Sequence, residues 1–201
     1  MSVTLSEAKL LVSLARSAIE NYLRSNEVFE VKESDIPIRL KIKQGVFTSL
    51  YRYDTKELRG CIGFPYPTYP LYKAVILSAI EASINDPRFA PVTINELDNI
   101  VIELSLLTTP EKIEVDSPLK YPEKIDIGRD GLILRYKGVS ALLLPQVAVE
   151  QNWNPEEYLS NLCLKAGLPP DTWLDPEAEI LKFNAEIFVE LSPKGQVVRR
   201  G

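Results

Sequence analysis

Apolar residues near the start of the chain recur at the spacing of an amphipathic helix. Thr4 begins the pattern as an N-cap residue, and Glu7 three positions later completes a capping box. A period close to 3.6 residues places the next apolar side chains on one face, which we expect to pack on a core. These positions are Ala8, Leu11, Val12, Ala15, Ile19, Tyr22 and Leu23. The pattern predicts a first helix that ends near Ser25.

Alternation of apolar and polar residues, which is typical of strands with one buried face, recurs along the chain. Polar turns separate the first three alternating runs, so we expect these runs to form an antiparallel meander. The last run is polar on one face and apolar on the other, which indicates one wet face and one dry face. The predicted strands cover residues 36–42, 46–52, 58–64, 100–106 and 180–191.

A second helix is predicted at residues 69–85. Pro70 lies near its first turn, and the sequence Asn85-Asp86-Pro87 ends it. Small residues form a stripe along this helix, which indicates that it packs closely on the sheet. The stripe consists of Ala74, Val75, Ser78, Ala79 and Ala82.

Residues 113–177 differ in character from the rest of the chain, because Pro, Asp and Lys cluster at both ends of this segment. Inside it, Lys137-Gly138 predicts the turn of a β-hairpin. A short helix is predicted at 145–150 and a well-capped one at 154–167. Cys163 is in phase with the apolar residues of the second of these helices, so we expect it in the core.

These elements predict an α+β fold of two subdomains. The larger subdomain, residues 1–112 and 178–201, holds both termini and an antiparallel sheet of about five strands packed by helices. The smaller subdomain, residues 113–177, is inserted into it and has its own hairpin and helices. The chain from Lys194 onward is mildly basic, and we expect a frayed end.

Composition and charge restrict the chemistry. The 201 residues carry a net charge of −5 and include no histidine. Catalysis by Ser–His–Asp or Cys–His groups is therefore excluded, and so are zinc sites that need histidine. The negative charge argues against nucleic acid as the main partner. We expect neither a metal nor a cofactor.

No stretch of the sequence reaches the roughly 20 apolar residues that span a bilayer, and the first residues lack the order of a signal peptide. We therefore expect a cytoplasmic protein with no membrane partner, in which both cysteines stay reduced. Fifteen prolines, together with many Glu, Lys and Ile residues, indicate a thermophilic source.

The segment LRGCIG, residues 58–63, places Cys61 between two glycines and close to Arg59. On a regular strand these two side chains share a face, with about 7 Å between their Cα atoms. The guanidinium would then lower the pKa of a catalytic Cys61 thiol. A second interpretation is a ligand- or partner-contacting loop that includes Arg59, Gly60 and Gly63. A third is packing, because glycine and cysteine are small enough to lie beneath a helix.

Asp86 and Arg88, in the sequence NDPRF, have two interpretations. They form an ion pair that ties the turn after the second helix, or Arg88 binds an anionic ligand beside Arg59.

Gln146, Glu150 and Trp153 are expected near the seam between the subdomains, where a ligand cleft is a common feature. The alternative is structural. In that case the two polar side chains bind backbone groups, and Trp153 fills a gap in the core.

Several strings of the chain resemble, in the same order, those of the AMMECR-type proteins, a family named for a human chromosomal region. The strings are LRGCIG, NDPRFAPV, IVIELSLLTTPEKI, GLIL, ALLLPQVAVEQNW and LCLKAGLP. The resemblance covers nearly the whole chain and implies an α+β protein of two unequal subdomains from a microbial, archaeal source. It also implies two protein partners, one similar to dioxygenases and one a radical S-adenosylmethionine protein. It implies no catalytic residue.

Two functions are expected from these observations. The first is an accessory or regulatory binding module that acts with partner proteins through a cleft near LRGCIG, lined by Arg59, Arg88, Gln146 and Trp153. The second is an enzyme or modification substrate in which Arg59 activates the thiol of Cys61. The lack of histidine, of metal-ligand spacing and of a phosphate-binding loop favours the first function.

Overall fold

The computed structural model describes residues 2–200 and divides them into two compact units. Unit 1 runs up to Leu107 and resumes at Glu186, and unit 2 is Thr108–Ala185. The boundaries that the sequence suggested, at 113 and 177, both lie inside unit 2.

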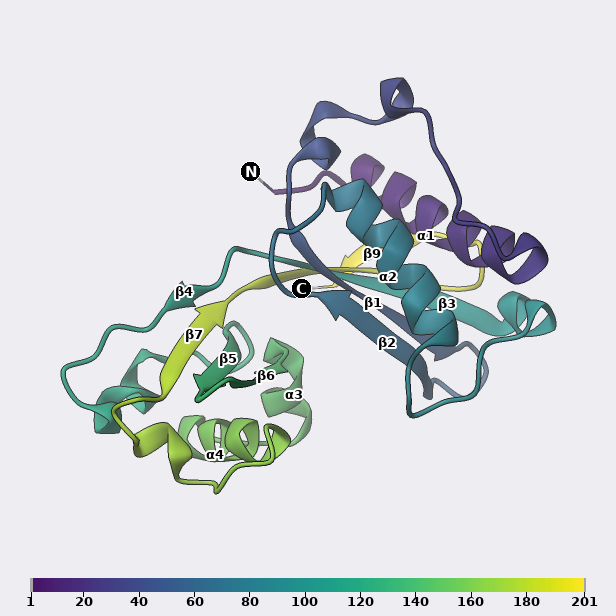
Figure 1. The fold of residues 1–201 in the computed structure, drawn as a ribbon. Helices are drawn as coiled ribbons and strands as arrows, with labels where there is room; N and C mark the ends of the chain where they lie inside the picture. Colours follow the sequence, from purple (N-terminus) through teal and green to yellow (C-terminus); the bar gives the residue numbers. More distant parts are fainter. Residues whose placement is uncertain (1, 201) are drawn as a thin grey trace. The chain divides into compact units, whose positions relative to one another are not determined.

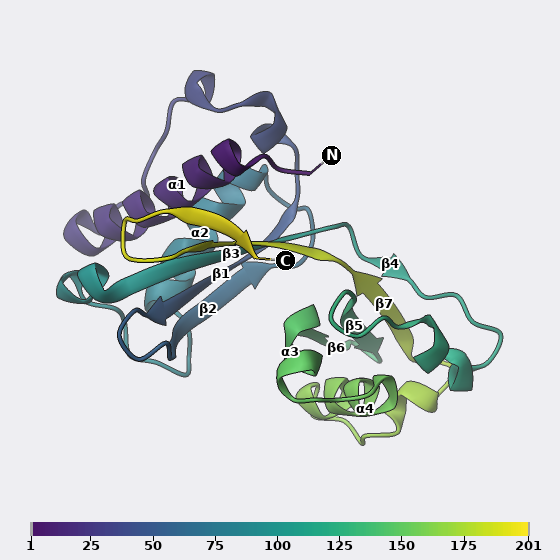
Figure 2. The ribbon, with the colours of Figure 1, turned by 180° about the vertical axis from the view of Figure 1, so that it is seen from behind.

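Unit 1 is a five-stranded antiparallel sheet with two helices (Figure 1). The strands lie in the order β2-β1-β3-β8-β9, and Figures 1 and 2 show both helices on the same face of the sheet. The elements are α1 (Leu5–Ser25), α2 (Leu71–Ile84), β1 (Gly45–Arg52), β2 (Leu58–Phe64), β3 (Ile100–Leu107), β8 (Ala185–Glu190) and β9 (Val197–Arg200).

The predicted first helix is confirmed, including its capping box. The Thr4 hydroxyl accepts a hydrogen bond from the backbone N–H of Glu7, and the Glu7 carboxylate accepts one from the backbone N–H of Thr4. Asn26 ends the helix in the left-handed conformation, with φ of 60°. Both ends of α1 are therefore fixed by local sequence.

Helix α2 lies directly on strands β1 and β2. Its Ser78 hydroxyl is 2.7 Å from the hydroxyl of Thr48 on β1. A Cβ atom at Gly60 on β2 would overlap the carbonyl oxygen of Ala82. The predicted close packing of this small-residue helix on the sheet is confirmed. Thr48 and Gly60 therefore lie on the helix-covered face of the sheet.

The strand predicted at 36–42 is wrong. The chain forms a 3₁₀ turn, Ile38–Lys41, in that region. Ile36 and Leu40 are both buried, whereas Ile38 is 83% exposed. In a strand Ile36, Ile38 and Leu40 would all share one face, so the exposure of Ile38 between two buried residues fits a helical turn, which the alternating isoleucines do not reveal.

The long strand predicted at 180–191 is in fact two strands. Strand β7 (Glu179–Phe183) belongs to unit 2, and β8 belongs to the sheet of unit 1. Between them, the backbone oxygen of Asn184 accepts a hydrogen bond of 2.9 Å from the backbone N–H of Thr108. Alternation cannot show that a strand changes sheets, because both sheets have the same side-chain period.

The frayed C-terminal end predicted from Lys194 onward is also wrong. Strand β9 pairs with β8, with Val198 opposite Val189, and Val197 is buried. The two valines within a basic tail supply the side chains that anchor it to the sheet.

Unit 2 has a four-stranded sheet in the order β4-β7-β5-β6. The predicted hairpin at Lys137-Gly138 is confirmed, since both residues have positive φ, 46° and 84°. The two predicted helices are present, and Cys163 is fully buried in the core beneath them. The remaining elements are β4 (Glu111–Lys112), β5 (Gly131–Tyr136), β6 (Val139–Leu143), α3 (Pro145–Glu150) and α4 (Pro155–Lys165).

The α+β fold class is confirmed by two sheets and their helices. Among residues 2–200, no helix combines the length and the apolar character needed to cross a membrane.

Replacement of Gly60 by alanine tests the contact between α2 and β2. We expect Gly60→Ala to lower the free energy of unfolding by about 3 kcal/mol, because the added methyl group meets backbone rather than a movable side chain. Urea unfolding measures the change. The control is Gly167→Ala, where φ is 74°. An added Cβ atom at this position would have no other atom within 4 Å, so we expect only backbone strain of about 1 kcal/mol. Equal effects of the two substitutions would contradict the steric explanation.

Candidate functional site

The segment LRGCIG forms strand β2, but it contains a β-bulge. Leu50 of β1 lies opposite Gly60 and Tyr51 lies opposite Leu58, so Arg59 is the extra residue. A bulge interrupts the alternation of side chains between the two faces. Arg59 and Cys61 are therefore not arranged as on a regular strand.

Arg59 is committed to other partners. Its Nε donates to Oε1 of Glu96 at 2.9 Å, and its Nη1 donates to the backbone oxygen of Ala90 at 2.8 Å. The side chain is buried, and these contacts hold the loop that follows α2. Arg88, and not Arg59, is the arginine whose charge acts on the pKa of the Cys61 thiol.

Cys61 lies on the face of the sheet opposite α2. Its register partner Ser49 donates a hydrogen bond of 3.1 Å from its hydroxyl to Sγ of Cys61. The backbone N–H of Cys61 donates to Oδ2 of Asp86 at 2.8 Å. The thiol is half-buried, so its contacts come mainly from the protein.

Asp86 and Arg88 form the ion pair that one interpretation of the sequence predicted. Nη2 of Arg88 lies 2.7 Å from Oδ2 of Asp86, and Nε lies 3.0 Å from Oδ1, which makes the pair bidentate. The hydrogen bond from the Arg88 guanidinium lowers the pKa of Asp86 to about 2. The Asp86 side chain is 2% exposed and that of Arg88 is 56% exposed, so the pair offers a guanidinium to solvent.

Burial raises the pKa of the Cys61 thiol above its ordinary value of 9.0. The hydrogen bond from Ser49 and the charge of Arg88 act in the opposite direction but do not overcome burial. The charges of Asp86 and Glu103 add to the increase. A thiol with a raised pKa is mainly protonated at neutral pH, which makes it a weak nucleophile.

Strand β3 adds two polar residues to the same face that the sequence-based predictions missed. Glu103 lies opposite Ser49, and Ser105 lies opposite Phe47. Both are buried, at 2% and 1% exposure. We call Ser49, Cys61, Glu103 and Ser105 the polar sheet face. The signal in the sequence was the interruption of the apolar run IVIELSLL by Glu and Ser.

Of the two polar side chains that β3 contributes to the polar sheet face, one has a hydrogen-bond partner and the other has none among residues 2–200. Oε2 of Glu103 accepts a hydrogen bond of 2.7 Å from Nη1 of Arg200 on β9. Oγ of Ser105 has no hydrogen-bond partner among residues 2–200. A buried hydroxyl without a partner costs about 1–3 kcal/mol, which makes Ser105 an unusual position.

The two glycines of LRGCIG have packing roles. Gly60 admits the backbone of α2, and a Cβ atom at Gly63 would overlap the ring of Phe47. Gly63 thus leaves room for the ring of Phe47, its register partner on β1. The structure therefore supplies a steric reason for both glycines.

Three of the predicted site residues belong to unit 2, namely Gln146, Glu150 and Trp153. Oε1 of Gln146 is buried and has no hydrogen-bond partner among the described residues, whereas Glu150 is exposed. The Trp153 ring is 6.4 Å from the ring of Tyr158, centroid to centroid. The predicted site residues are therefore divided between the two units. Within residues 2–200, no group of three or more Cys, Asp or Glu side chains is arranged to hold a metal ion.

The Asp86–Arg88 pair predicts a pH-dependent contribution to stability. Asp86 has a pKa of about 2 in the folded protein, against an ordinary value of 3.8. Its ionised carboxylate therefore stabilises the fold at pH values above 3.8, and this contribution is lost as the pH falls toward 2. We expect Asp86→Asn to lower the free energy of unfolding by about 2 kcal/mol at neutral pH. The difference from the unmodified protein should shrink on acidification, measured by urea unfolding.

The control for this prediction is Asp98→Asn, which removes a carboxylate from an exposed pair with Lys194. We expect it to change the free energy of unfolding by less than about 0.5 kcal/mol at any pH. An effect of Asp86→Asn that stays constant down to the pKa of about 2 would show that the carboxylate charge is not its source.

The raised pKa of Cys61 predicts slow alkylation. We expect iodoacetamide to modify Cys61 slowly at neutral pH, with the rate rising only above the ordinary pKa of 9.0. Peptide mass spectrometry distinguishes Cys61 from the buried Cys163. Ser49→Ala, which removes the donor to Sγ, should move the rate profile to still higher pH. Rapid modification of Cys61 at neutral pH would contradict the prediction and support a nucleophilic thiol.

Archaeal proteins are similar to this chain in sequence, and a solved structure of one of them has the same fold. The chain is 52% identical over 198 residues to Protein MJ0810 of Methanocaldococcus jannaschii, covering 98% of this chain and 97% of the relative. It is 53% identical to Protein PF1979 of Pyrococcus furiosus, covering 96% and 92% of the two chains. The crystal structure of the uncharacterised protein PH0010 from Pyrococcus horikoshii matches with a TM-score of 0.92 at 50% identity, covering 97% of each chain.

These archaeal relatives match almost end to end, and none of their names states an activity. The model of the AMMECR1 family matches residues 12–188, which include every residue of the polar sheet face. The resemblance noted from LRGCIG and the later strings is confirmed, and the chain belongs to the AMMECR1 family.

Proposed function

We propose that this chain is a cytoplasmic accessory binding module that acts with partner proteins, and that the polar sheet face of unit 1 takes part in recognition. The proposed partners are those implied by the family resemblance, a dioxygenase-like protein and a radical S-adenosylmethionine protein. Gln146 and Trp153 of unit 2 are proposed to contribute further contacts.

The observation that carries this proposal is the buried hydroxyl of Ser105. Buried polar groups in native proteins almost always have a hydrogen-bond partner, so an unpaired one on a central strand needs an explanation. Ser105 is 1% exposed, and its Oγ has no partner among residues 2–200. A bound group that supplies the missing hydrogen bond would explain why the position is polar.

Two arginines provide the charge for such recognition. Arg88 and Arg200 each pair with a carboxylate that is 2% exposed, while their own side chains are 56% and 59% exposed. The buried carboxylates of Asp86 and Glu103 fix the two guanidiniums without covering them. Guanidinium groups held in this way are suited to acidic groups on a partner.

The state of Cys61 supports binding over catalysis. A thiol whose pKa is raised by burial is a weak nucleophile at neutral pH. The sequence also contains no histidine that could take its proton. The alternative function, an enzyme or modification substrate that uses Cys61, lacks a group that activates the thiol.

Replacement of Ser105 by alanine tests the proposal. We expect Ser105→Ala to leave the free energy of unfolding unchanged or raise it by up to about 1 kcal/mol, because an unpaired buried hydroxyl is removed. The same substitution should weaken partner binding about tenfold, the effect of one lost buried hydrogen bond. Calorimetry of the purified chain with each of the two proposed partners measures the affinity.

The matched control is Ser6→Ala on the exposed side of α1, which should alter neither stability nor binding. A loss of more than about 1 kcal/mol of stability in Ser105→Ala would show that the hydroxyl has a structural partner. Failure of both proteins to bind the unmodified chain would contradict the proposed partners.

A further inference from the structure

A cavity of about 470 Å³ lies between α1 and the hairpin that joins β8 to β9, and we call it the α1 cavity. Figure 2 shows β9 running beside α1, and the two elements are in contact. All of the lining residues belong to unit 1, and none of them belongs to the polar sheet face. The volume falls within the range of about 300–1,000 Å³ that is usual for small-molecule sites.

The buried part of this lining is an ion pair between Arg16 of α1 and Glu190 of β8. Nε of Arg16 donates to Oε1 of Glu190 at 3.1 Å, and the other guanidinium nitrogens donate to the backbone oxygens of Leu97 and Ile100 at 3.2 and 2.8 Å. Oε2 of Glu190 also accepts a hydrogen bond of 2.9 Å from the backbone N–H of Ile102. The two charges offset each other, and their polar atoms are held by the protein.

The exposed part of the lining is positively charged, because its charged residues are Lys9 of α1 and Lys194 of the hairpin. Within residues 2–200, Lys9 forms no ion pair. Lys194 lies 3.2 Å from Oδ1 of Asp98, whose side chain is 85% exposed, and an exposed pair of this kind is weak. The lining holds three cations and one carboxylate, an excess of two positive charges in a chain whose net charge is −5.

Local structure fixes the positions from which the two lysines extend. Lys9 and Ser13 both line the cavity and lie one turn apart on α1, so their side chains are neighbours on one helix face. Lys194 has a φ of 59° in a tight turn, which the backbone N–H of Gly195 closes with a bond of 2.8 Å to the oxygen of Ser192. The Ser13 hydroxyl adds an uncharged hydrogen-bond donor to the lining.

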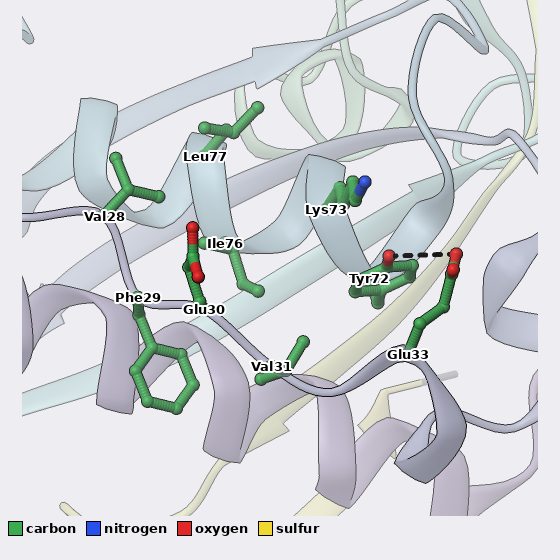
Figure 3. A pocket seen from close by; sticks show the side chains of 9 residues that line it. All are labelled: Val28, Phe29, Glu30, Val31, Glu33, Tyr72, Lys73, Ile76 and Leu77. Atoms are coloured by element: carbon green, nitrogen blue, oxygen red, sulfur yellow. Dashed lines mark hydrogen bonds between the residues drawn. The ribbon is translucent and has the colours of Figure 1, made fainter.

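Another cavity of unit 1, of about 380 Å³, lies between α2 and the connector that follows α1 (Figure 3). Its lining carries two carboxylates, Glu30 and Glu33, and one ammonium, Lys73. An anion is disfavoured there, because the carboxylates outnumber the ammonium. Of these two cavities, the α1 cavity is the one suited to an anionic ligand.

We propose that the α1 cavity binds the phosphate group of a small soluble compound. A phosphomonoester carries close to two negative charges at neutral pH, which matches the excess of two positive charges in the lining. Lysine ammonium groups are common ligands of phosphate. A carboxylate, with one charge, would leave one of the two lysines unpaired. The buried side chains of Val12 and Val197 also line the cavity and suit the carbon skeleton of such a compound.

Titration calorimetry of the full chain with glycerol 3-phosphate tests the ligand class. We expect glycerol 3-phosphate to bind, and glycerate, a three-carbon carboxylate with one charge fewer, to bind about tenfold more weakly. Binding should also weaken as salt is raised toward about 1 M, where charges are screened over about 3 Å. Equal affinity for the two compounds, or no binding of glycerol 3-phosphate, would overturn the proposal.

Sedimentation with vesicles distinguishes a soluble ligand from a lipid headgroup that carries the same phosphate group. Phosphatidylcholine vesicles that contain phosphatidic acid should leave the chain in the supernatant. Cosedimentation of the chain with these vesicles would overturn the assignment to a soluble compound.

Substitutions test the location of the site. Lys9→Gln and Lys194→Gln should each weaken the binding of glycerol 3-phosphate about tenfold, with an unchanged thermal unfolding temperature because both side chains are exposed. The matched control is Lys73→Gln, a lysine that lines the other cavity, and it should have no effect. An equal loss in the control, or no loss in either of the two variants, would overturn the assignment.

A variant that strengthens binding separates the site from effects on folding, because damage to the fold does not raise affinity. Asp98→Asn removes the carboxylate that competes for Lys194. It should tighten the binding of glycerol 3-phosphate about twofold, the size of effect expected from an exposed ion pair. Unchanged or weaker binding in Asp98→Asn would overturn the role of Lys194.

Discussion

The close contact between Gly60 on β2 and the backbone of Ala82 on α2 is the constraint on which the rest of unit 1 depends. It fixes the last turn of α2 against the edge strand of the sheet. Asp86 follows directly after that turn, and its carboxylate reaches the backbone N–H of Cys61. The contact also lies next to the bulge that directs Arg59 toward Glu96. The close packing that Gly60 permits therefore lies beside the contacts of both Arg59 and Cys61.

The polar sheet face follows from this arrangement, because α1 and α2 cover only the other side of the sheet. Glu103 and Ser105 lie on the central strand β3, where a polar side chain is costly unless it is paired. Arg200 from the last strand pairs with Glu103, whereas Ser105 keeps its hydroxyl unpaired. The two carboxylate–arginine pairs leave the guanidinium groups of Arg88 and Arg200 exposed, and the proposed role in recognition is based on this.

Local sequence was sufficient where the decisive contacts are short-range. The capping box of Thr4 and the Lys137-Gly138 turn were predicted because each depends on neighbours within a few residues, and the small-residue stripe of α2 was predicted because helical spacing alone places it on one face. The strand predicted at 36–42 failed because alternating isoleucines fit both a strand and a turn that buries every fourth residue. The tail failed because its basic residues hid a hairpin with the preceding strand β8, in which Glu190 lies opposite Val197.

The sequence by itself determined the fold class, the family and the exclusion of histidine chemistry, since composition and short-range patterns fix these properties. It also brought attention to LRGCIG and to the Asp86–Arg88 pair. Only the tertiary structure decided that Arg59 is the extra residue of a bulge and that burial raises the pKa of the Cys61 thiol. The physical reason is that desolvation and strand register depend on neighbours far away in the chain, which no local pattern encodes.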